Sequence, residues 1–319
     1  MKKMTVLLLA ALLLFSLAAC GNSDDGKYNI GIVQLVQHDA LDAATNGFMD
    51  AVKEELGAEN VNFDLQNASG DSANCATIVN GFVSDDVDLI LANATPALLA
   101  AVNGTQTIPV LGTSITDYGD ALKIENFDGV VGGNISGTSD QAPLEKQGEM
   151  LIELCPDAKN VGILYCSAEP NSVFQADQVE AYLTGEGLNV TRYTFTDSND
   201  VASVTATACS ECEALYIQTD NTAATCGEAI HNAAAGSGVP IISGEANACK
   251  LFGVATLSID YYKIGQEAGR MAAKILKGEA DISEMPIGYD DEPVKLYNPD
   301  ICAELGITPP ADYQPMDMG

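Results

Sequence analysis

Basic residues, histidine and tryptophan are scarce in this chain of 319 residues. Lys and Arg number 14 against 45 Asp and Glu, so the formal net charge is −31; there are two His and no Trp. This balance argues against a nucleic-acid partner, because binding phosphates needs a basic surface. For the same reason we do not expect an anionic membrane to attract the body of the protein.

Catalytic signatures are also missing. The sequence has no G-x-S-x-G, H-E-x-x-H or G-x-x-x-x-G-K-[ST] string, so it does not favour a hydrolase or a nucleotide-using enzyme. We therefore predict a protein that is not an enzyme and that uses no cofactor and no metal. Hydrophobic residues make up 47% and charged residues 18%, which is a globular composition, and the length suggests two domains.

The N-terminus has the features of a signal peptide. A short basic start precedes an apolar stretch, too short for a membrane span, that closes in L-A-A-C at Cys20. Small residues before a Cys resemble a bacterial lipobox. We predict that residues 1–19 are removed, that Cys20 carries the lipid and that residues 20–27 form a tether on the extracytoplasmic face of the membrane. The alternative is an ordinary secretory signal with an incidental Cys.

Of the nine Cys, eight remain after Cys20, and an even number outside the cell allows disulfides. We predict at least one, with Cys226–Cys249 as the chosen pair, since both lie near strand-to-helix connections. Cys209 and Cys212 form a C-x-x-C. No second such pair or nearby His completes a zinc site, so we favour a structural role over a redox or metal role.

Short apolar runs alternate with amphipathic stretches along the rest of the chain, and the pattern occurs twice. Two successive β/α series predict an α/β fold with two doubly wound parallel sheets, each with helices on both faces. Ligands in such sheets bind outside the carboxyl ends of the strands, so two facing lobes would form a cleft that closes on a small molecule. The predicted strands are 28–35, 61–66, 87–92, 108–112, 127–133 (strand or crossover), 160–165, 189–195, 214–218, 239–242, 252–259 and 296–297.

Several local strings resemble one family. Residues 31–42, G-I-V-Q-L-V-Q-H-D-A-L-D, resemble the opening G-I-x-Q-x-x-E-H-P-A-L-D of the tryptophan/tyrosine-type substrate-binding lipoproteins of ABC importers. Residues 82–90, 219–222 and 255–265 resemble further landmarks, and the resemblance covers most of 28–308. Gln37 and Asp39 depart from it, because the family usually has Glu and Pro there. Cys166 also stands at a strand end expected to face the ligand.

The resemblance implies a type I periplasmic-binding fold with a three-crossover hinge. It implies an extracytoplasmic protein that captures a small solute, most simply an aromatic amino acid, by hinge closure and delivers it to an ABC permease. We expect a monomer that contacts the membrane only through its lipid. The implied parts are lobe 1 at 28–136 plus 264–282, lobe 2 at 137–263 plus 283–308, a C-terminal tail at 309–319, and crossovers near Ser136–Gly137, Tyr262–Lys263 and Pro286.

Candidate ligand residues follow from the fold. Helix N-termini after strands offer free N–H groups to a carboxylate, and Thr95, Thr113 and Ser114 would add hydroxyl donors there. Helix capping and turn formation are the alternative uses of these residues. The remaining candidates near the cleft are Gln37, His38, Leu41, Asn93, Pro96, Ala97, Asn171 and Asn221.

An amino group needs an acceptor, best a carboxylate. Asp220 is the first candidate, followed by Glu245 and Asp260, because each follows a second-lobe strand; the alternative for Asp220 is capping the next helix. Two other classes stay open: a surface sensor or enzyme on the same scaffold, and an importer component for a solute that is not an amino acid.

Overall fold

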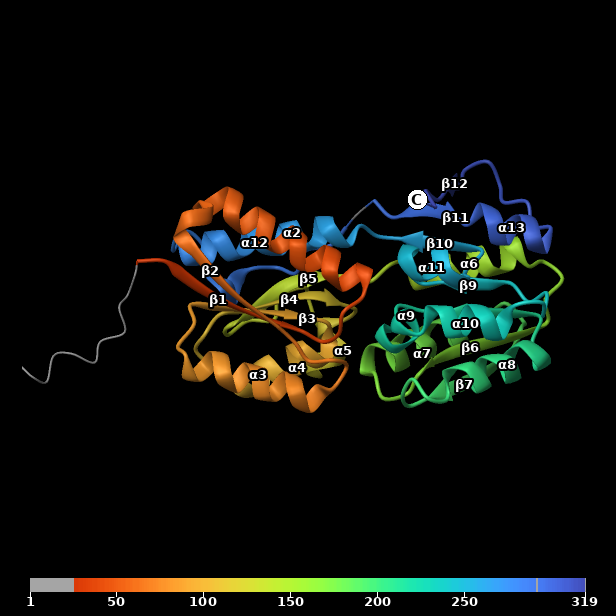
Figure 1. Cartoon of the computed structure of the whole chain (residues 1–319), viewed down its shortest axis with the longest axis horizontal. Coiled ribbons are helices and arrows are strands. Elements are labelled where there is room, and N and C mark those ends of the chain that lie inside the picture. Colours follow the sequence, from red (N-terminus) through yellow and green to blue (C-terminus); the bar gives the residue numbers. More distant parts are fainter. Residues whose placement is uncertain (1–25, 291, 319) are drawn as a thin grey trace, which may run out of the picture.

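The structure, a computed structural model, describes residues 26–290 and 292–318. It consists of two lobes side by side along the long axis, each built around its own sheet (Figure 1). Among the described residues, no helix combines the length and apolar character needed to cross a bilayer. The predicted signal peptide and the lipidation of Cys20 lie outside the described residues.

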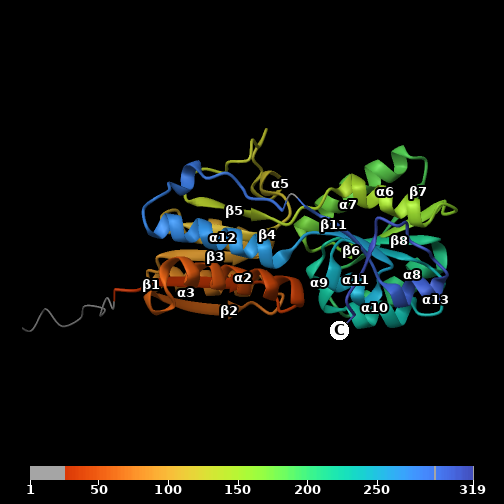
Figure 2. The ribbon, with the colours of Figure 1, turned by 90° about the horizontal axis from the view of Figure 1, so that it is seen from above.

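The first lobe holds a parallel sheet of five strands in the order β2-β1-β3-β4-β5. Its central strands are buried on both faces, which is why they read as nearly continuous apolar runs. Helices α3 and α4 cover one face, and α2 and α12 cover the other (Figures 1 and 2). The elements are β1 (Tyr28–Gln34), α2 (Asp39–Leu56), β2 (Val61–Asn67), α3 (Ser72–Ser84), β3 (Leu89–Asn93), α4 (Thr95–Gly104), β4 (Val110–Ile115), α5 (Tyr118–Leu122), β5 (Ile135–Ser139) and α12 (Tyr261–Leu276).

The second lobe holds seven strands in the order β12-β11-β10-β9-β8-β6-β7, with β11 antiparallel to β10. Helices α6, α7 and α13 pack on one face, and α8, α10 and α11 on the other. The elements are α6 (Leu144–Leu154), β6 (Asn160–Cys166), α7 (Pro170–Gly185), β7 (Asn189–Phe195), α8 (Val201–Glu211), β8 (Ala214–Ile217), α9 (Asn221–Thr225), α10 (Gly227–Ala234), β9 (Ile241–Ser243), α11 (Ala246–Phe252), β10 (Ala255–Ser258), β11 (Val294–Tyr297), α13 (Pro299–Leu305) and β12 (Gln314–Pro315).

The chain passes between the lobes three times: after β5, between β10 and α12, and between the short 3₁₀ helix Ile282–Glu284 and β11. The three crossings are bonded to one another. Ser139 N donates to Gly288 O at 2.8 Å, joining the first and third, and Asp260 N donates to Asp290 Oδ2 at 2.9 Å, joining the second and third. Together they form a hinge of three linked segments.

Helix α12 lies directly against α2, because glycines remove the side chains between them (Figure 1). A Cβ placed at Gly265 would lie 2.0 Å from the Ala44 carbonyl oxygen, and one at Gly47 would lie 2.2 Å from the Tyr262 oxygen. Both distances are far shorter than any van der Waals contact, so this packing requires glycine. The contact fixes the start of α12, at Tyr261, relative to the first sheet.

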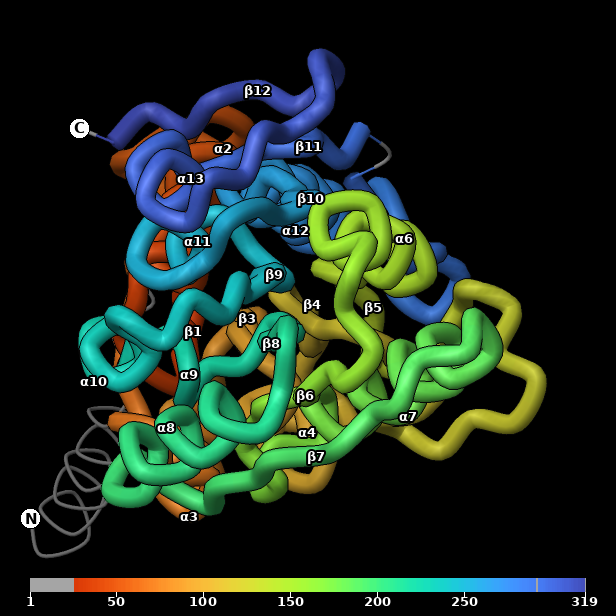
Figure 3. Tube along the Cα trace, turned by 90° about the vertical axis from the view of Figure 1, so that its right-hand side faces the viewer, coloured from red at the N-terminus to blue at the C-terminus, as the bar shows by residue number. Residues whose placement is uncertain are grey.

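Two segments differ from the sequence-based expectation. The fifth strand is Ile135–Ser139 and does not lie at 127–133, where positive φ angles at Gly129, Gly132 and Gly133 break the extended backbone. The expected tail 309–319 contributes β12, which pairs with β11 at the edge of the second sheet (Figure 3).

The predicted Cys226–Cys249 disulfide is wrong, because both thiols are free, as are the other six Cys between residues 75 and 302. Cys249 belongs to α11 and is fully buried against Gly253, whereas Cys226 is only partly buried, at the junction of α9 and α10 beside Thr225. The C-x-x-C closes helix α8, with Cys212 as its C-cap. Burial raises the pKa of Cys209 and of Cys212, so neither carries the reactive thiolate of a redox pair.

Candidate functional site

A small cavity lies between the lobes, where the carboxyl ends of both sheets face each other. The first lobe lines it with the start of α2 after β1 and with the end of β4. The second lobe lines it with the segments that follow β8 and β9 and with the start of α7. Two residues come from the crossings. The lining residues are His38, Leu41, Ser114, Thr116, Asp140, Asn171, Thr219, Asp220, Asn221, Ala224, Glu245 and Tyr261.

The charge in this cavity is of one sign. Asp140, Asp220 and Glu245 are all buried in its lining, and no Lys or Arg lines it. Burial raises the pKa of all three carboxyls, to about 7 for Asp220 and about 7 for Glu245. The neighbouring charge of Glu169 raises the pKa of Asp220 further. Such a lining suits a ligand that brings a positive group.

Two of these carboxylates also hold helix ends. Asp220 caps α9 by accepting from Ala223 N at 2.7 Å, and its other oxygen accepts from Cys166 N at 2.7 Å. Glu245 caps α11 by accepting from the backbone N–H groups of Asn247, at 2.7 Å, and Ala248. Asp220 therefore does cap the next helix, which is the alternative role that we expect from the sequence.

The third carboxylate, Asp140, belongs to the hinge. It directly follows β5 in the first crossing, and Tyr261 at the end of the second crossing donates its hydroxyl to Asp140 Oδ2 at 2.8 Å. Thr116 Oγ1 donates to the other oxygen at 3.2 Å. The carboxylate is thus held from two sides by first-lobe elements.

Two polar atoms in the lining have no partner. Ser114 Oγ, from the first lobe, and Asn171 Oδ1, from the second, are buried without a hydrogen bond, and their residues are only 5% and 7% exposed. An unpaired buried polar atom is costly, so these atoms indicate where a ligand would bind. Ser114 also has φ of 55°, a left-handed conformation that is strained for serine.

One direct hydrogen bond joins the lobes across the cavity. His38 Nε2 donates to Asn221 Oδ1 at 3.2 Å. Burial lowers the pKa of His38, so the neutral ring is favoured. Asn221 is itself fixed by Glu169, which accepts from its backbone N–H at 3.1 Å and from its side-chain amide at 2.6 Å.

Half of the residues proposed from the sequence line this cavity: His38, Leu41, Ser114, Asn171, Asp220, Asn221 and Glu245. Asn93 and Thr113 lie buried within the sheet instead. Asn93 Nδ2 donates to Leu41 O at 2.8 Å, and Thr113 accepts from Thr138 Oγ1 at 3.1 Å, so both support the loops behind the cavity.

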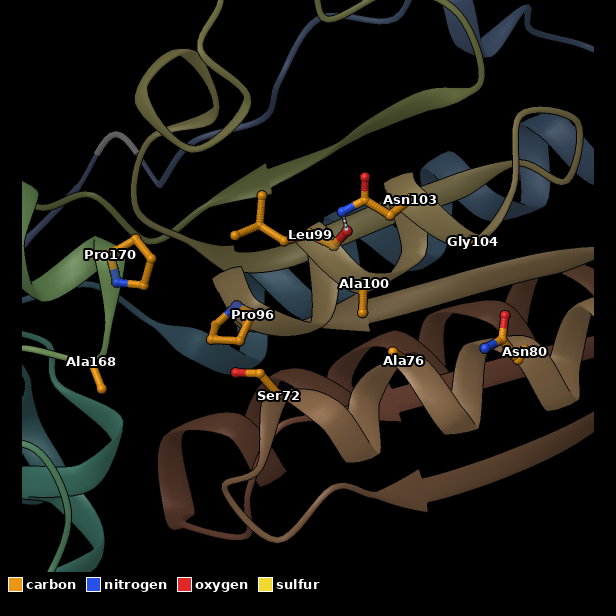
Figure 4. Close-up of a pocket in the computed structure, with 10 residues that line it drawn as sticks. All are labelled: Ser72, Ala76, Asn80, Pro96, Leu99, Ala100, Asn103, Gly104, Ala168 and Pro170. Carbon is orange, nitrogen blue, oxygen red and sulfur yellow. Dashed lines mark hydrogen bonds between the residues drawn. The ribbon is translucent and has the colours of Figure 1, made fainter.

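The other candidates lie outside the cavity. Thr95 and Ala97 are buried in the first turn of α4, and Gln37 and Asp260 are exposed. Pro96 lines a separate groove between α3 and α4, where Ala168 and Pro170 of the second lobe face it (Figure 4).

Sequence reasoning missed five lining residues: Thr116, Asp140, Thr219, Ala224 and Tyr261. Asp140 could have been found from the correct position of β5, because it is the first residue after that strand. Thr219 immediately precedes the predicted Asp220, so its place at the same strand end also follows from the pattern.

Comparisons with known proteins agree with this architecture. Residues 29–313 match the family model described as ABC transporter substrate binding protein. A curated tyrosine-binding protein from Clostridioides difficile (strain R20291) is 33% identical over 279 residues, covering 87% of this chain and 80% of its own.

Two solved structures are similar along most of their length. One is an ABC domain in complex with L-Trp from Streptococcus pneumoniae, 31% identical, with a TM-score of 0.85, covering 89% of this chain and 96% of that one. The other is the ligand-free, open structure of a substrate-binding protein with adhesive properties from Clostridium difficile. It is 34% identical, with a TM-score of 0.69, covering 91% and 99%. With the family model spanning both lobes and their cavity, the chain belongs to the ABC transporter substrate-binding protein family.

Proposed function

We propose that this substrate-binding protein captures an aromatic L-amino acid in the cavity between its lobes and presents it to an ABC permease. The observation that carries the proposal is the pair of unpartnered atoms, Ser114 Oγ and Asn171 Oδ1, one from each lobe. A ligand that bonds both atoms gains contacts only when the lobes are closed, so its binding favours closure.

The chemistry of the cavity suits a zwitterion. Asp140, Asp220 and Glu245 would face the ammonium, and the Ser114 hydroxyl can donate to the carboxylate. Leu41 and Tyr261 offer apolar and aromatic surface to a ring. The relatives named for tyrosine and crystallised with L-Trp support the same ligand class.

Closure by a hinge is supported by the two structural neighbours. This chain is about equally identical to both, yet it matches the L-Trp complex with a TM-score of 0.85 and the ligand-free, open structure with 0.69. The arrangement of its lobes is thus closer to that of the ligand-bound relative. The three linked crossings would serve as the axis of the motion.

The proposal also covers the oligomeric state of the protein, its anchoring and the fate of its ligand. We infer a monomer that lipid on Cys20 holds on the extracytoplasmic face of the membrane. We also infer that it releases its ligand chemically unchanged. Mass spectrometry of the molecule extracted from denatured protein would identify the ligand, and a chemically altered product would favour an enzyme instead.

A binding assay tests the proposed ligand. Because the chain has no Trp, added L-tryptophan is its own fluorescent probe against a tyrosine background, and calorimetry extends the assay to L-tyrosine and L-phenylalanine. We expect at least one to bind below millimolar concentration. Ser114→Ala should weaken it roughly tenfold through the lost hydrogen bond, whereas Gln37→Ala, at an exposed position, should leave it unchanged. Failure of all three to bind would refute the aromatic assignment.

A further inference from the structure

The start of α2 presents His38 and Leu41 to the cavity, yet the helix has no side-chain cap. His38 occupies the N-cap position, where Ser, Thr, Asn or Asp would bond a free backbone N–H group of the first turn. Its ring makes no such bond and donates instead across the cavity to Asn221 Oδ1 at 3.2 Å. Because the cap residue is bonded to the other lobe, the start of α2 has to be held by other groups.

Three buried polar side chains of the first lobe hold it: Gln34, Thr45 and Asn93. The side-chain amide of Asn93, at the end of β3, donates to Leu41 O at 2.8 Å and to Thr45 Oγ1 at 2.9 Å. Thr45 donates its hydroxyl to Gln34 Oε1 at 2.7 Å. Gln34, the last residue of β1, donates in turn to Asp42 Oδ1 at 2.7 Å.

These hydrogen bonds form a chain with one direction, which runs from the Asn93 amide to the Asp42 carboxylate. Bonds in a buried chain of this kind polarise and strengthen one another. The Gln34 amide also donates to Val36 O at 2.9 Å, in the loop that leads from β1 to His38. The chain therefore ties two strands of the first sheet to the loop before His38 and to the helical turn after it.

A second observation points to a role beyond stability. Asn93 Oδ1 is buried without a hydrogen-bond partner, on a residue that is 0% exposed. An unpaired buried acceptor lowers stability, so the amide at this position is better explained by what its N–H groups hold. One of them holds the backbone of Leu41, whose side chain lines the cavity.

We propose that Thr45 is a positioning residue of the binding site: from the middle of the hydrogen-bond chain it fixes the first turn of α2, so that His38 reaches Asn221 when ligand is bound. Thr45 does not line the cavity and acts through His38. The effect on affinity rests on the proposed function, whereas the anchoring of α2 can be measured without ligand.

Hydrogen exchange of the ligand-free protein, followed by NMR, tests the anchoring. Thr45→Val keeps the shape of the side chain but removes the hydroxyl, so Gln34 Oε1 loses its donor and the Asn93 amide loses one acceptor. The backbone N–H of Asp42, which donates to His38 O in the first turn, should then exchange several-fold faster. Thr45→Ser keeps the hydroxyl and should keep the wild-type rate.

Thr205→Val is the matched control. Thr205 is also buried in a helix, but its hydroxyl donates to the Val201 carbonyl of the same helix, α8, at 2.7 Å. This helix belongs to the second lobe and does not line the cavity. Thr205→Val should therefore leave both the exchange at the start of α2 and the ligand affinity unchanged, whatever it does to the melting temperature.

Binding of L-tryptophan tests the consequence for the site. Thr45→Val should weaken it roughly three- to tenfold, the value of one neutral hydrogen bond, and Thr45→Ser should bind like wild type. Because Thr45 acts through His38, Thr45→Val should weaken binding less in a His38→Ala protein than in wild type.

Four outcomes decide the inference. Wild-type exchange at the start of α2 in Thr45→Val would refute the anchoring. Faster exchange with unchanged affinity would make the chain purely structural and overturn the positioning role. Equal losses of affinity with and without the His38 ring would overturn the action through His38. If wild type binds none of the aromatic amino acids but exchange still rises in Thr45→Val and not in Thr205→Val, the proposed ligand fails and the anchoring is upheld.

Discussion

Replacing Gly265 with alanine tests how the packing of α12 on α2 supports the binding cavity. Alanine gains about 1 kcal/mol over glycine in a helix interior. Against this, the new Cβ would lie 2.0 Å from the Ala44 carbonyl oxygen. The obstacle is backbone, which cannot rotate aside like a side chain, so the two helices must separate.

The cost of such overpacking is typically about 1–3 kcal/mol, and backbone clashes fall at the upper end. The clash therefore exceeds the helix-propensity gain, and we expect a net loss of about 1–2 kcal/mol. For a domain of this size that corresponds to a melting temperature about 2–8 °C lower. Differential scanning calorimetry measures it directly.

A matched control is available in the same lobe. Gly81 lies on the exposed side of α3, and a Cβ there would have no atom within 4 Å. Gly81→Ala should therefore raise the melting temperature. The same substitution in two helices of one lobe should thus change the melting temperature in opposite directions. Because Tyr261 begins α12 and lines the cavity, Gly265→Ala should also weaken L-tryptophan binding, whereas Gly81→Ala should not. A Gly265→Ala protein as stable as Gly81→Ala would refute the reasoning.

Three further changes have defined outcomes. Asp220→Asn removes the acceptor of one of two buried N–H groups and should lower stability by about 1–2 kcal/mol in chemical denaturation; an unchanged free energy of unfolding would contradict the capping role of Asp220. Burial in the closed form raises the pKa of Glu245 to about 7 from its ordinary 4.5, so protonation favours closure; this contribution is lost as the pH rises through 7. Small-angle scattering should then give a smaller radius of gyration for the ligand-free protein at pH 5 than at pH 8. In Glu245→Gln the difference between the two pH values should be smaller. His38, whose pKa burial lowers, acts in the opposite direction. Cys20→Ala should move the protein from the membrane fraction to the soluble fraction, and a variant that still sediments would disprove the lipid anchor.

The alternation of strands and helices could be predicted from the sequence because the buried parallel strands are short apolar runs. The same reasoning brought Ser114 and Asp220 to the cavity, since each follows such a run. β5 could not be found in this way. Its residues Ile135–Ser139 are mostly Gly, Ser and Thr, less apolar than 127–133.

Long-range hydrogen bonds make such a polar strand stable in the interior. Ser136 Oγ donates to Met285 O, and Ser139 Oγ donates to Thr116 O, so the hydroxyls are paired when buried. The partner of Ser136 is 149 positions away along the chain, and no local pattern can indicate it. Missing this strand also hid Asp140, the residue that follows it.

The place of α12 in the first lobe has a consequence for the order in which the protein can fold during synthesis. One face of the first sheet is covered by Ala268, Met271 and Ala272, which are made only after most of the second lobe. The second sheet in turn waits for β11 and β12, near the end of the chain. A nascent chain ending before residue 261 therefore carries both lobes with exposed apolar faces. Neither lobe can reach its final stability until nearly the whole polypeptide is available, so the two lobes mature together.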